Sequence, residues 1–161
     1  MTEISSFQFE SRSLADTDRL GQTIGATLQA GTVLGLDGTL GAGKTRLTQA
    51  IGLGLGIKQG NVVSPTFTIM VPHMGRLPLI HLDASRIKSP EEVDELGLDE
   101  VVSDGGVLVV EWSDRIADLL PTVDLSVQIQ HVDDEQRRFL LTASSERGRT
   151  LLAAVEHHFS G

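Results

Sequence analysis

Short apolar runs, separated by polar and glycine-rich turns, divide the chain into strands. The run 107–112 is almost continuously apolar, which is typical of a strand buried on both faces of a parallel sheet. Residues 125–130 and 138–142 instead alternate between apolar and polar, and the acidic turn between them predicts an antiparallel pair. Further strands are predicted at 7–11, 32–36 and 77–83, and a polar turn runs into another within 61–71.

Apolar residues at helical spacing predict helices between these strands. The first helix follows a capping box at 13–16 and is expected to end at Gly31. A later helix opens at Ser89, a capping residue that is followed by proline at the first helical position. The apolar faces comprise Leu20, Ile24 and Leu28 in the first helix, Leu47, Ala50, Ile51 and Leu55 in the second, and Leu151, Leu152, Val155 and Phe159 in the last. This order predicts an α/β fold, with a mainly parallel central sheet flanked by helices and antiparallel strands near the C-terminus.

The segment that links strand 32–36 to the next helix matches the phosphate-binding pattern G-x-x-x-x-G-K-[ST] at residues 38–45. Its glycines let the backbone approach an anion closely, so that N–H groups at the helix N-terminus contact phosphate oxygens. Lys44 is expected to meet the β- and γ-phosphates, and the Thr45 hydroxyl to ligate Mg²⁺. The sequence therefore predicts a single P-loop domain over residues 1–161. The expected nucleotide-binding residues are Gly38, Thr39, Leu40, Gly41, Ala42, Gly43, Lys44, Thr45 and Arg46.

Two acidic residues end predicted strands, and both are candidates for catalysis. Ligands of open α/β sheets bind at the carboxyl ends of the parallel strands, so Asp83 and Glu111 are expected beside the phosphates. One could hold Mg²⁺, directly or through a water, while the other orients or polarises the attacking water. Trp112 directly follows Glu111 and belongs either to the core or to the nucleotide site. The strand of Asp83 is the weaker of the two, because His81 interrupts its apolar pattern.

The hydroxyl-rich segment 64–68 follows the helix of the phosphate loop. Nucleotide-sensing switch loops occupy this place in P-loop proteins and become ordered on γ-phosphate and Mg²⁺ contacts. Thr66 and Thr68 are the candidate ligating residues. The same residues are equally typical of an ordinary turn.

Composition narrows the function classes. The chain has 161 residues, of which 40% are hydrophobic, so one domain can bury a substantial core. A net charge of −9 argues against a broad basic surface that grips nucleic acid, so a partner is expected to hold any RNA. Because there are no cysteines, disulfide scaffolds and thiol chemistry are excluded. With no secretory leader or long apolar span in the sequence, a cytoplasmic protein without membrane contact is expected.

Taken together, these motifs resemble the TsaE family, also called YjeE, the bacterial ATPases of tRNA threonylcarbamoyladenosine synthesis. The resemblance rests on segments 38–45, 63–68, 80–83 and 110–115, and extends from about residue 10 to residue 142. It implies a weakly hydrolysing ATP-binding protein that acts on the TsaB–TsaD pair. That pair, with TsaC or a relative making the threonylcarbamoyl-adenylate, would modify adenosine 37 of tRNAs reading ANN codons, and this chain would contact tRNA mainly through the complex.

The resemblance also implies residue roles. The chain departs from the family pattern at Ala84-Ser85, where leucine and tyrosine are usual. The implied roles are phosphate binding for Gly41, Gly43, Lys44 and Thr45, a switch-like catalytic role for Thr66, acidic catalytic and metal roles for Asp83 and Glu111, and a place beside the nucleotide for Trp112.

Other functions of a P-loop protein compete with this one. A regulatory GTPase needs an N-K-x-D segment to read guanine, and the sequence contains none. A small-molecule or nucleoside kinase typically brings an Arg-rich lid, whereas lysines and arginines here total only 13. A non-catalytic module whose bound ATP assembles a complex is a third alternative. The oligomeric state and the division of roles between Asp83 and Glu111 stay open.

Overall fold

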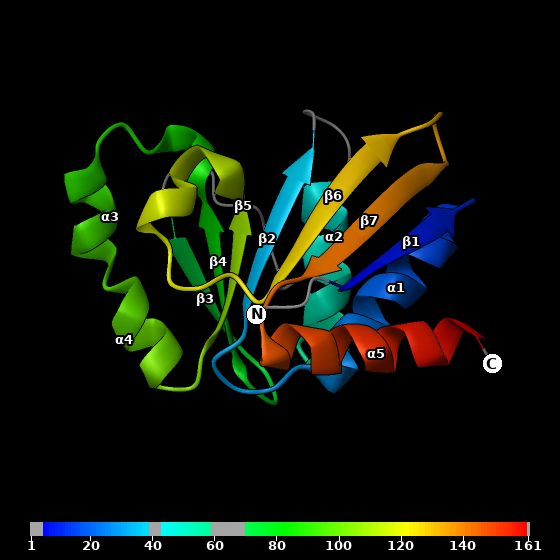
Figure 1. The fold of residues 1–161 in the computed structure, drawn as a ribbon, viewed down its shortest axis with the longest axis horizontal. Helices are drawn as coiled ribbons and strands as arrows, with labels where there is room; N and C mark the ends of the chain where they lie inside the picture. The colour runs from blue at the N-terminus through cyan, green and yellow to red at the C-terminus, as the bar shows by residue number, and fades with distance from the viewer. Residues whose placement is uncertain (1–4, 39–42, 59–69, 161) are drawn as a thin grey trace.

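The computed structural model describes residues 5–38, 43–58 and 70–160, and its strands form one twisted seven-stranded sheet (Figure 1). The strand order is β1-β7-β6-β2-β5-β4-β3. The four middle strands β6, β2, β5 and β4 run parallel, whereas β1, β7 and β3 pair antiparallel. The bounds are β1 (Ser5–Ser11), β2 (Val33–Gly38), β3 (Met70–Met74), β4 (Pro78–Asp83), β5 (Val107–Glu111), β6 (Leu125–His131) and β7 (Arg137–Ala143). The predicted parallel centre and the antiparallel β6–β7 pair are confirmed.

Helices cover both faces of this sheet. One apolar cluster joins it to α1 (Leu14–Thr27), α2 (Lys44–Gly54) and α5 (Glu146–Ser160). The second joins the opposite face to α3 (Pro90–Leu96), α4 (Leu98–Ser103) and the 3₁₀ helices η1 (Ala84–Arg86) and η2 (Ser113–Leu119).

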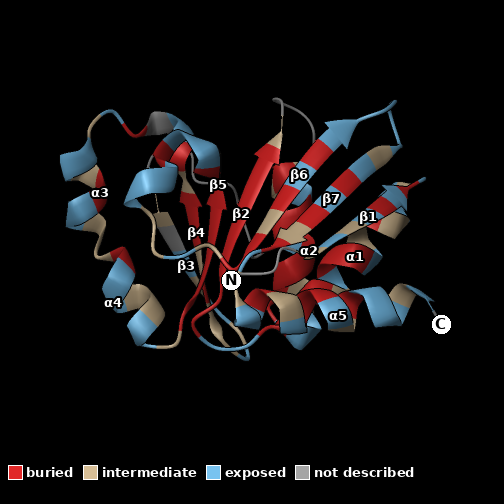
Figure 2. Ribbon diagram, in the orientation of Figure 1, coloured by how far each residue is buried: buried red, intermediate tan, exposed pale blue. Residues whose placement is uncertain are grey.

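Strand β5 is buried along its whole length, as its apolar run predicts (Figure 2). Val107 and Val109 lie in the cluster under α1, α2 and α5, while Leu108 and Val110 lie in the opposite cluster. Because successive side chains of a strand point to opposite faces, Glu111 shares the face of Val107 and Val109, which is the face that α2 covers. The sheet therefore delivers the Glu111 carboxylate toward the helix that carries the phosphate-loop lysine.

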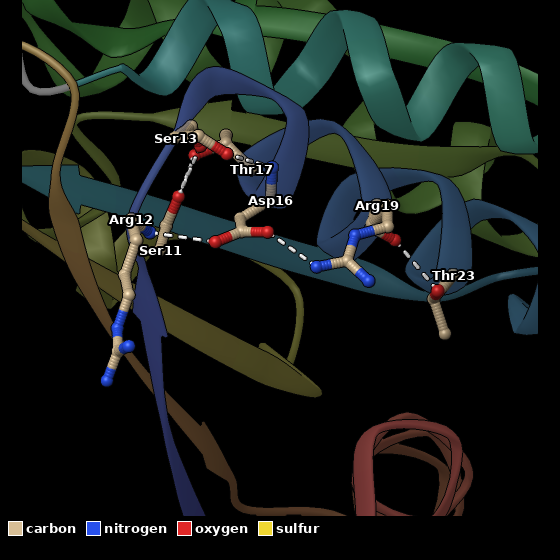
Figure 3. A network of polar contacts seen from close by, with 7 residues as sticks. All are labelled: Ser11, Arg12, Ser13, Asp16, Thr17, Arg19 and Thr23. Carbon is tan, nitrogen blue, oxygen red and sulfur yellow. Dashed lines mark hydrogen bonds and ion pairs between the residues drawn. The ribbon is translucent and has the colours of Figure 1, made fainter.

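The start of α1 carries the predicted cap (Figure 3). Ser13 Oγ accepts a hydrogen bond of 3.2 Å from the backbone N–H of Asp16, and the Asp16 carboxylate accepts one of 2.9 Å from Arg12 N–H. The return bond thus reaches one residue further than in an ordinary capping box. The Asp16 carboxylate also pairs with Arg19, one turn along the helix.

The predicted end of α1 was wrong, whereas α3 begins after Ser89 with proline at its first position, as predicted. Helix α1 ends at Thr27 and not near Gly31, because Leu28 adopts extended backbone (φ −60°, ψ 140°) and buries its side chain. Ser89 has N-cap backbone geometry, but its side chain makes no cap hydrogen bond. Instead, Glu92 Oε2 accepts a hydrogen bond of 2.7 Å from Lys88 N–H. Of the strand expected within 61–71, only its last part can be assessed, since 59–69 lie outside the described residues.

Candidate nucleotide-binding site

Lys44 is the first residue of α2 and lies at the carboxyl end of β2. Gly43 before it has left-handed backbone (φ 113°), which a glycine adopts without strain. Lys44 as a residue is only 5% exposed. Its Nζ donates a hydrogen bond of 2.6 Å to the Gly38 carbonyl and lies 4.2 Å from the centroid of the Trp112 ring. The ammonium is therefore held at a helix N-terminus, where backbone N–H groups also favour anions.

Acidic groups surround this ammonium. Burial lowers the pKa of Lys44, and the negative charges of Glu111, Asp37, Asp83 and Asp114 oppose that shift. These carboxylates come from the ends of β2, β4 and β5 and from η2, so the fold brings together acids that are far apart in sequence. A magnesium-bound polyphosphate suits this arrangement, because it supplies both an anion for Lys44 and a cation for the acids.

Asp83 and Glu111 are direct neighbours in the sheet. They are register partners at the carboxyl ends of the parallel strands β4 and β5, as predicted. Asp83 is also the N-cap of η1, since its Oδ1 accepts hydrogen bonds from Ser85 N–H (2.9 Å) and Ser85 Oγ (2.7 Å). Ser85 is one of the two residues at which the chain departs from the TsaE pattern, so this departure supplies a direct partner to the aspartate.

His81 was missed as a site residue. Its ring is fully buried, and its Nε2 contacts Oε2 of Glu111. The sequence signal was present, because a histidine two residues before Asp83 in a strand lies on the same face as that acid. His81, which interrupts the apolar pattern of β4, therefore belongs to the candidate site.

Asp37 and Ser113 were also missed, and they hold the turn that carries Trp112. Among the described residues, Trp112 is the one non-glycine with positive φ (62°). Ser113 Oγ donates a 2.6 Å hydrogen bond to Asp37 Oδ2, and Asp114 N–H donates one of 3.1 Å to Asp37 Oδ1. Burial raises the pKa of Asp37, while these bonds oppose the rise. Gly35 permits the close approach, because a Cβ there would lie 2.5 Å from Ser113 Oγ.

The structure describes some of the remaining predicted residues, and others lie outside the described ranges. Thr45 directly follows Lys44 in the sequence and is half-buried in the first turn of α2. The Arg46 guanidinium makes hydrogen bonds of 3.0 and 2.8 Å to the Asp18 carboxylate, so it joins α2 to α1. Arg137 of β7, which was not predicted, has its Nε 3.9 Å from the position that a Cβ on Gly43 would take. Outside the described residues lie Thr39, Leu40, Gly41, Ala42, Thr66 and Thr68.

The donor set fits magnesium when a nucleotide shares the coordination. In the parts of the chain that the structure describes, no three His, Asp or Glu side chains are grouped to hold a metal ion by themselves. Magnesium is commonly bound by one or two carboxylates together with substrate phosphates and water. Thr45, Asp83 and Glu111 offer the oxygen ligands that such a site requires.

A phosphate-loop sequence between a central parallel strand and a helix, with acids ending the neighbouring strands, defines an α/β protein of the P-loop class. The family described as "Threonylcarbamoyl adenosine biosynthesis protein TsaE" matches residues 11–139, and the chain belongs to this family. The resemblance drawn from the sequence motifs is thereby confirmed.

Individual relatives agree with the family match. The chain is 40% identical over 127 residues to the tRNA threonylcarbamoyladenosine biosynthesis protein TsaE of Treponema pallidum, covering 79% of this chain and 93% of that protein. It is 38% identical to the protein of the same name from Bacillus subtilis, covering 89% of each. The crystal structure of Bacillus subtilis YdiB superposes with a TM-score of 0.80 at 30% identity, covering 97% of each chain. No helix in the described part of the chain is long and apolar enough to cross a membrane.

Proposed function

We propose that this protein binds ATP with Mg²⁺ between β2, α2 and β5 and hydrolyses it weakly to ADP and phosphate. The activity would serve the threonylcarbamoylation of adenosine 37 in tRNAs that read ANN codons. The observation that carries the proposal is the buried residue Lys44 at the N-terminus of α2, whose ammonium interacts with the carboxylates that end β4 and β5. The names of the relatives support the pathway, and the phosphate-loop sequence supports the ligand.

The residues of the site have separable tasks. The phosphates offer Lys44 stronger acceptors than the Gly38 carbonyl that it contacts, because an ionised acceptor makes the stronger hydrogen bond. Thr45 together with Asp83 or Glu111 would hold Mg²⁺, which when bound neutralises phosphate charge. The acid that does not hold the metal would orient the attacking water. Thr66 keeps the switch-like role that the family resemblance implies, and Trp112 would border the nucleotide.

The proposed partners are TsaB and TsaD. A P-loop domain spanning 1–161 with a net charge of −9 is a poor direct ligand for tRNA, so the complex is expected to hold the tRNA. Because the proposed complex modifies tRNA, we place the activity in the cytoplasm. ATP turnover in this arrangement would act on the complex and not on a small-molecule acceptor, which separates it from a kinase.

Replacing Glu111 by glutamine tests the proposal. The amide of Glu111→Gln would keep an oxygen for His81 and the size of the side chain but would lose the charge. Since the charge matters most in the transition state, Glu111→Gln should bind ATP·Mg²⁺ within about threefold of wild type. Single-turnover hydrolysis should fall about tenfold to a thousandfold. The same change at the exposed Glu156 of α5 is the matched control and should alter neither quantity.

The measurements are calorimetric ATP binding and ADP release, the latter with purified TsaB, TsaD and tRNA and with each omitted. Wild-type protein that binds no ATP would refute the proposal outright. If Glu111→Gln loses Mg²⁺-dependent binding but hydrolyses what it binds normally, Glu111 is chiefly a metal ligand and Asp83 directs the water. Binding that assembles the complex without any ADP release would instead identify a non-catalytic assembly module.

A further inference from the structure

Resting on the proposed ATPase function, we propose that His81 is a positioning residue that fixes the Glu111 carboxylate for ATP hydrolysis. His81 belongs to β4 and is the register partner of Val109 in the parallel strand β5. Glu111 lies two residues beyond Val109, on the same face of the sheet. The imidazole and the carboxylate thus point to the same side from adjacent strands, and Nε2 of the ring contacts Oε2 of the acid.

The proton on this contact can be assigned from chemistry. The proposed role of Glu111 requires an ionised carboxylate, which only accepts hydrogen bonds, so in that state Nε2 of His81 carries the hydrogen and donates it to Glu111. Within the described residues, Nδ1 of the same ring is buried and has no hydrogen-bond partner. The hydrogen bond with Glu111 therefore replaces a hydrogen bond to water that the ring loses when it is buried.

A purely structural role does not account for a histidine at this position. His81 is completely buried among the strands, and its neighbours Leu79 and Leu82 in β4 are fully buried apolar residues. An apolar side chain would fill the same space without burying two ring nitrogens, one of which lacks a partner among the described residues. What distinguishes histidine from leucine here is the hydrogen bond that it donates to Glu111.

The hydrogen bond has a direct consequence for the carboxylate. Glutamate has three side-chain torsions, and a partner on Oε2 restricts them and leaves Oε1 for the nucleotide site. A catalytic base or metal ligand that is oriented by a third group is the general form of an activated site. Because a displacement of about 1 Å can cost about a hundredfold in rate, loss of this restraint should appear in the chemical step.

Two amides of different length test the hydrogen bond itself. The amide nitrogen of His81→Gln can reach the position of Nε2, whereas that of His81→Asn is too short to reach Glu111. We expect single-turnover ATP hydrolysis of His81→Asn and His81→Leu to fall about tenfold to a hundredfold, with ATP·Mg²⁺ affinity within about threefold of wild type. His81→Gln should recover most of the rate. This comparison holds even if His81→Leu fails to fold, because both amide variants bury a similar polar group.

A control and a double-mutant cycle separate positioning from packing. His73→Leu makes the matched change on β3 at a half-buried histidine whose Nε2 also lacks a partner among the described residues, and it should keep the wild-type rate. On a Glu111→Gln background, His81→Asn should lower the rate by no more than about twofold further, because the charge that it positions is already gone. Melting temperatures of all variants report any general loss of stability.

Three outcomes would overturn the inference: equal rates for His81→Gln and His81→Asn, an equal loss in His73→Leu, or the full loss of rate on the Glu111→Gln background. In each case a wild-type protein that still binds and hydrolyses ATP would leave the proposed function intact. A wild type that does neither would remove the proposed function first.

Discussion

Gly35→Ala should disturb the candidate nucleotide site indirectly. The new methyl group would contact Ser113, which is not assigned to the nucleotide. A Cβ at this position would stand 2.5 Å from Oγ and 3.0 Å from Cβ of Ser113, so the start of η2 would have to move. The move breaks the 2.6 Å hydrogen bond from Ser113 to the Asp37 carboxylate. It also shifts Trp112, whose left-handed backbone precedes Ser113 and whose ring contacts the Lys44 ammonium.

The expected loss of stability in Gly35→Ala has two contributions. Overpacking a filled core costs about 1–3 kcal/mol, and losing a hydrogen bond to a charged group costs about 1.5–3 kcal/mol. Because relaxation offsets part of each, we expect the free energy of unfolding to fall by about 3 kcal/mol. For a protein of this size, that corresponds to a melting temperature lower by about 6–12 °C. ATP·Mg²⁺ affinity should weaken as well, since Trp112 and Lys44 no longer keep their relative positions.

Urea unfolding of Gly35→Ala, Ser113→Gly and the double variant measures the effect. Removing the Ser113 side chain takes away the atoms that the new methyl meets, so the double variant should be less destabilised than the two single changes combined. Intrinsic fluorescence follows Trp112 directly, since it is the only tryptophan in the chain. A loss below about 0.5 kcal/mol in Gly35→Ala, or full additivity in the double variant, would refute the close-approach argument.

Further predictions concern the lysine and the helix cap. Lys44→Met should remove the thermal stabilisation by ATP·Mg²⁺. The unliganded protein should lose about 2–4 kcal/mol, because the hydrogen bond to the Gly38 carbonyl and the cation–π contact with Trp112 are among the interactions that disappear. Undiminished stabilisation of the folded Lys44→Met variant by ATP would contradict this prediction. Hydrogen bonds from Arg12 N–H and then from Arg19 lower the pKa of Asp16, so its stabilising charge is fully present above the unfolded pKa and is lost as the pH falls through the folded pKa. At neutral pH, Asp16→Asn should therefore lower the free energy of unfolding by about 0.3–1 kcal/mol. In acid, the unfolding curves of the variant and the wild type should converge. A difference that stays constant with pH would show that the charge of Asp16 contributes nothing to stability.

Much of the architecture could be predicted because its signals are local. The apolar run of β5, the alternation in β6 and β7 and the phosphate-loop pattern each lie within a few consecutive residues. The end of α1 was harder to predict, because burial of Leu28 and the turn into β2 decided it and not the nearby glycine. The edge position of β1 was not predictable at all, since Ser5 pairs with Ala143 near the other end of the chain.

The sequence by itself determined the class of site: a lysine after a glycine-rich loop, and an acid at the end of each of two strands. Only the tertiary structure decided which groups act on those residues. His81 and Glu111 are 30 residues apart, Asp37 and Ser113 are 76 apart, and Arg46 is paired with Asp18 of another helix. A motif records which side chains are adjacent along the chain, whereas strand register and helix packing set which distant side chains meet.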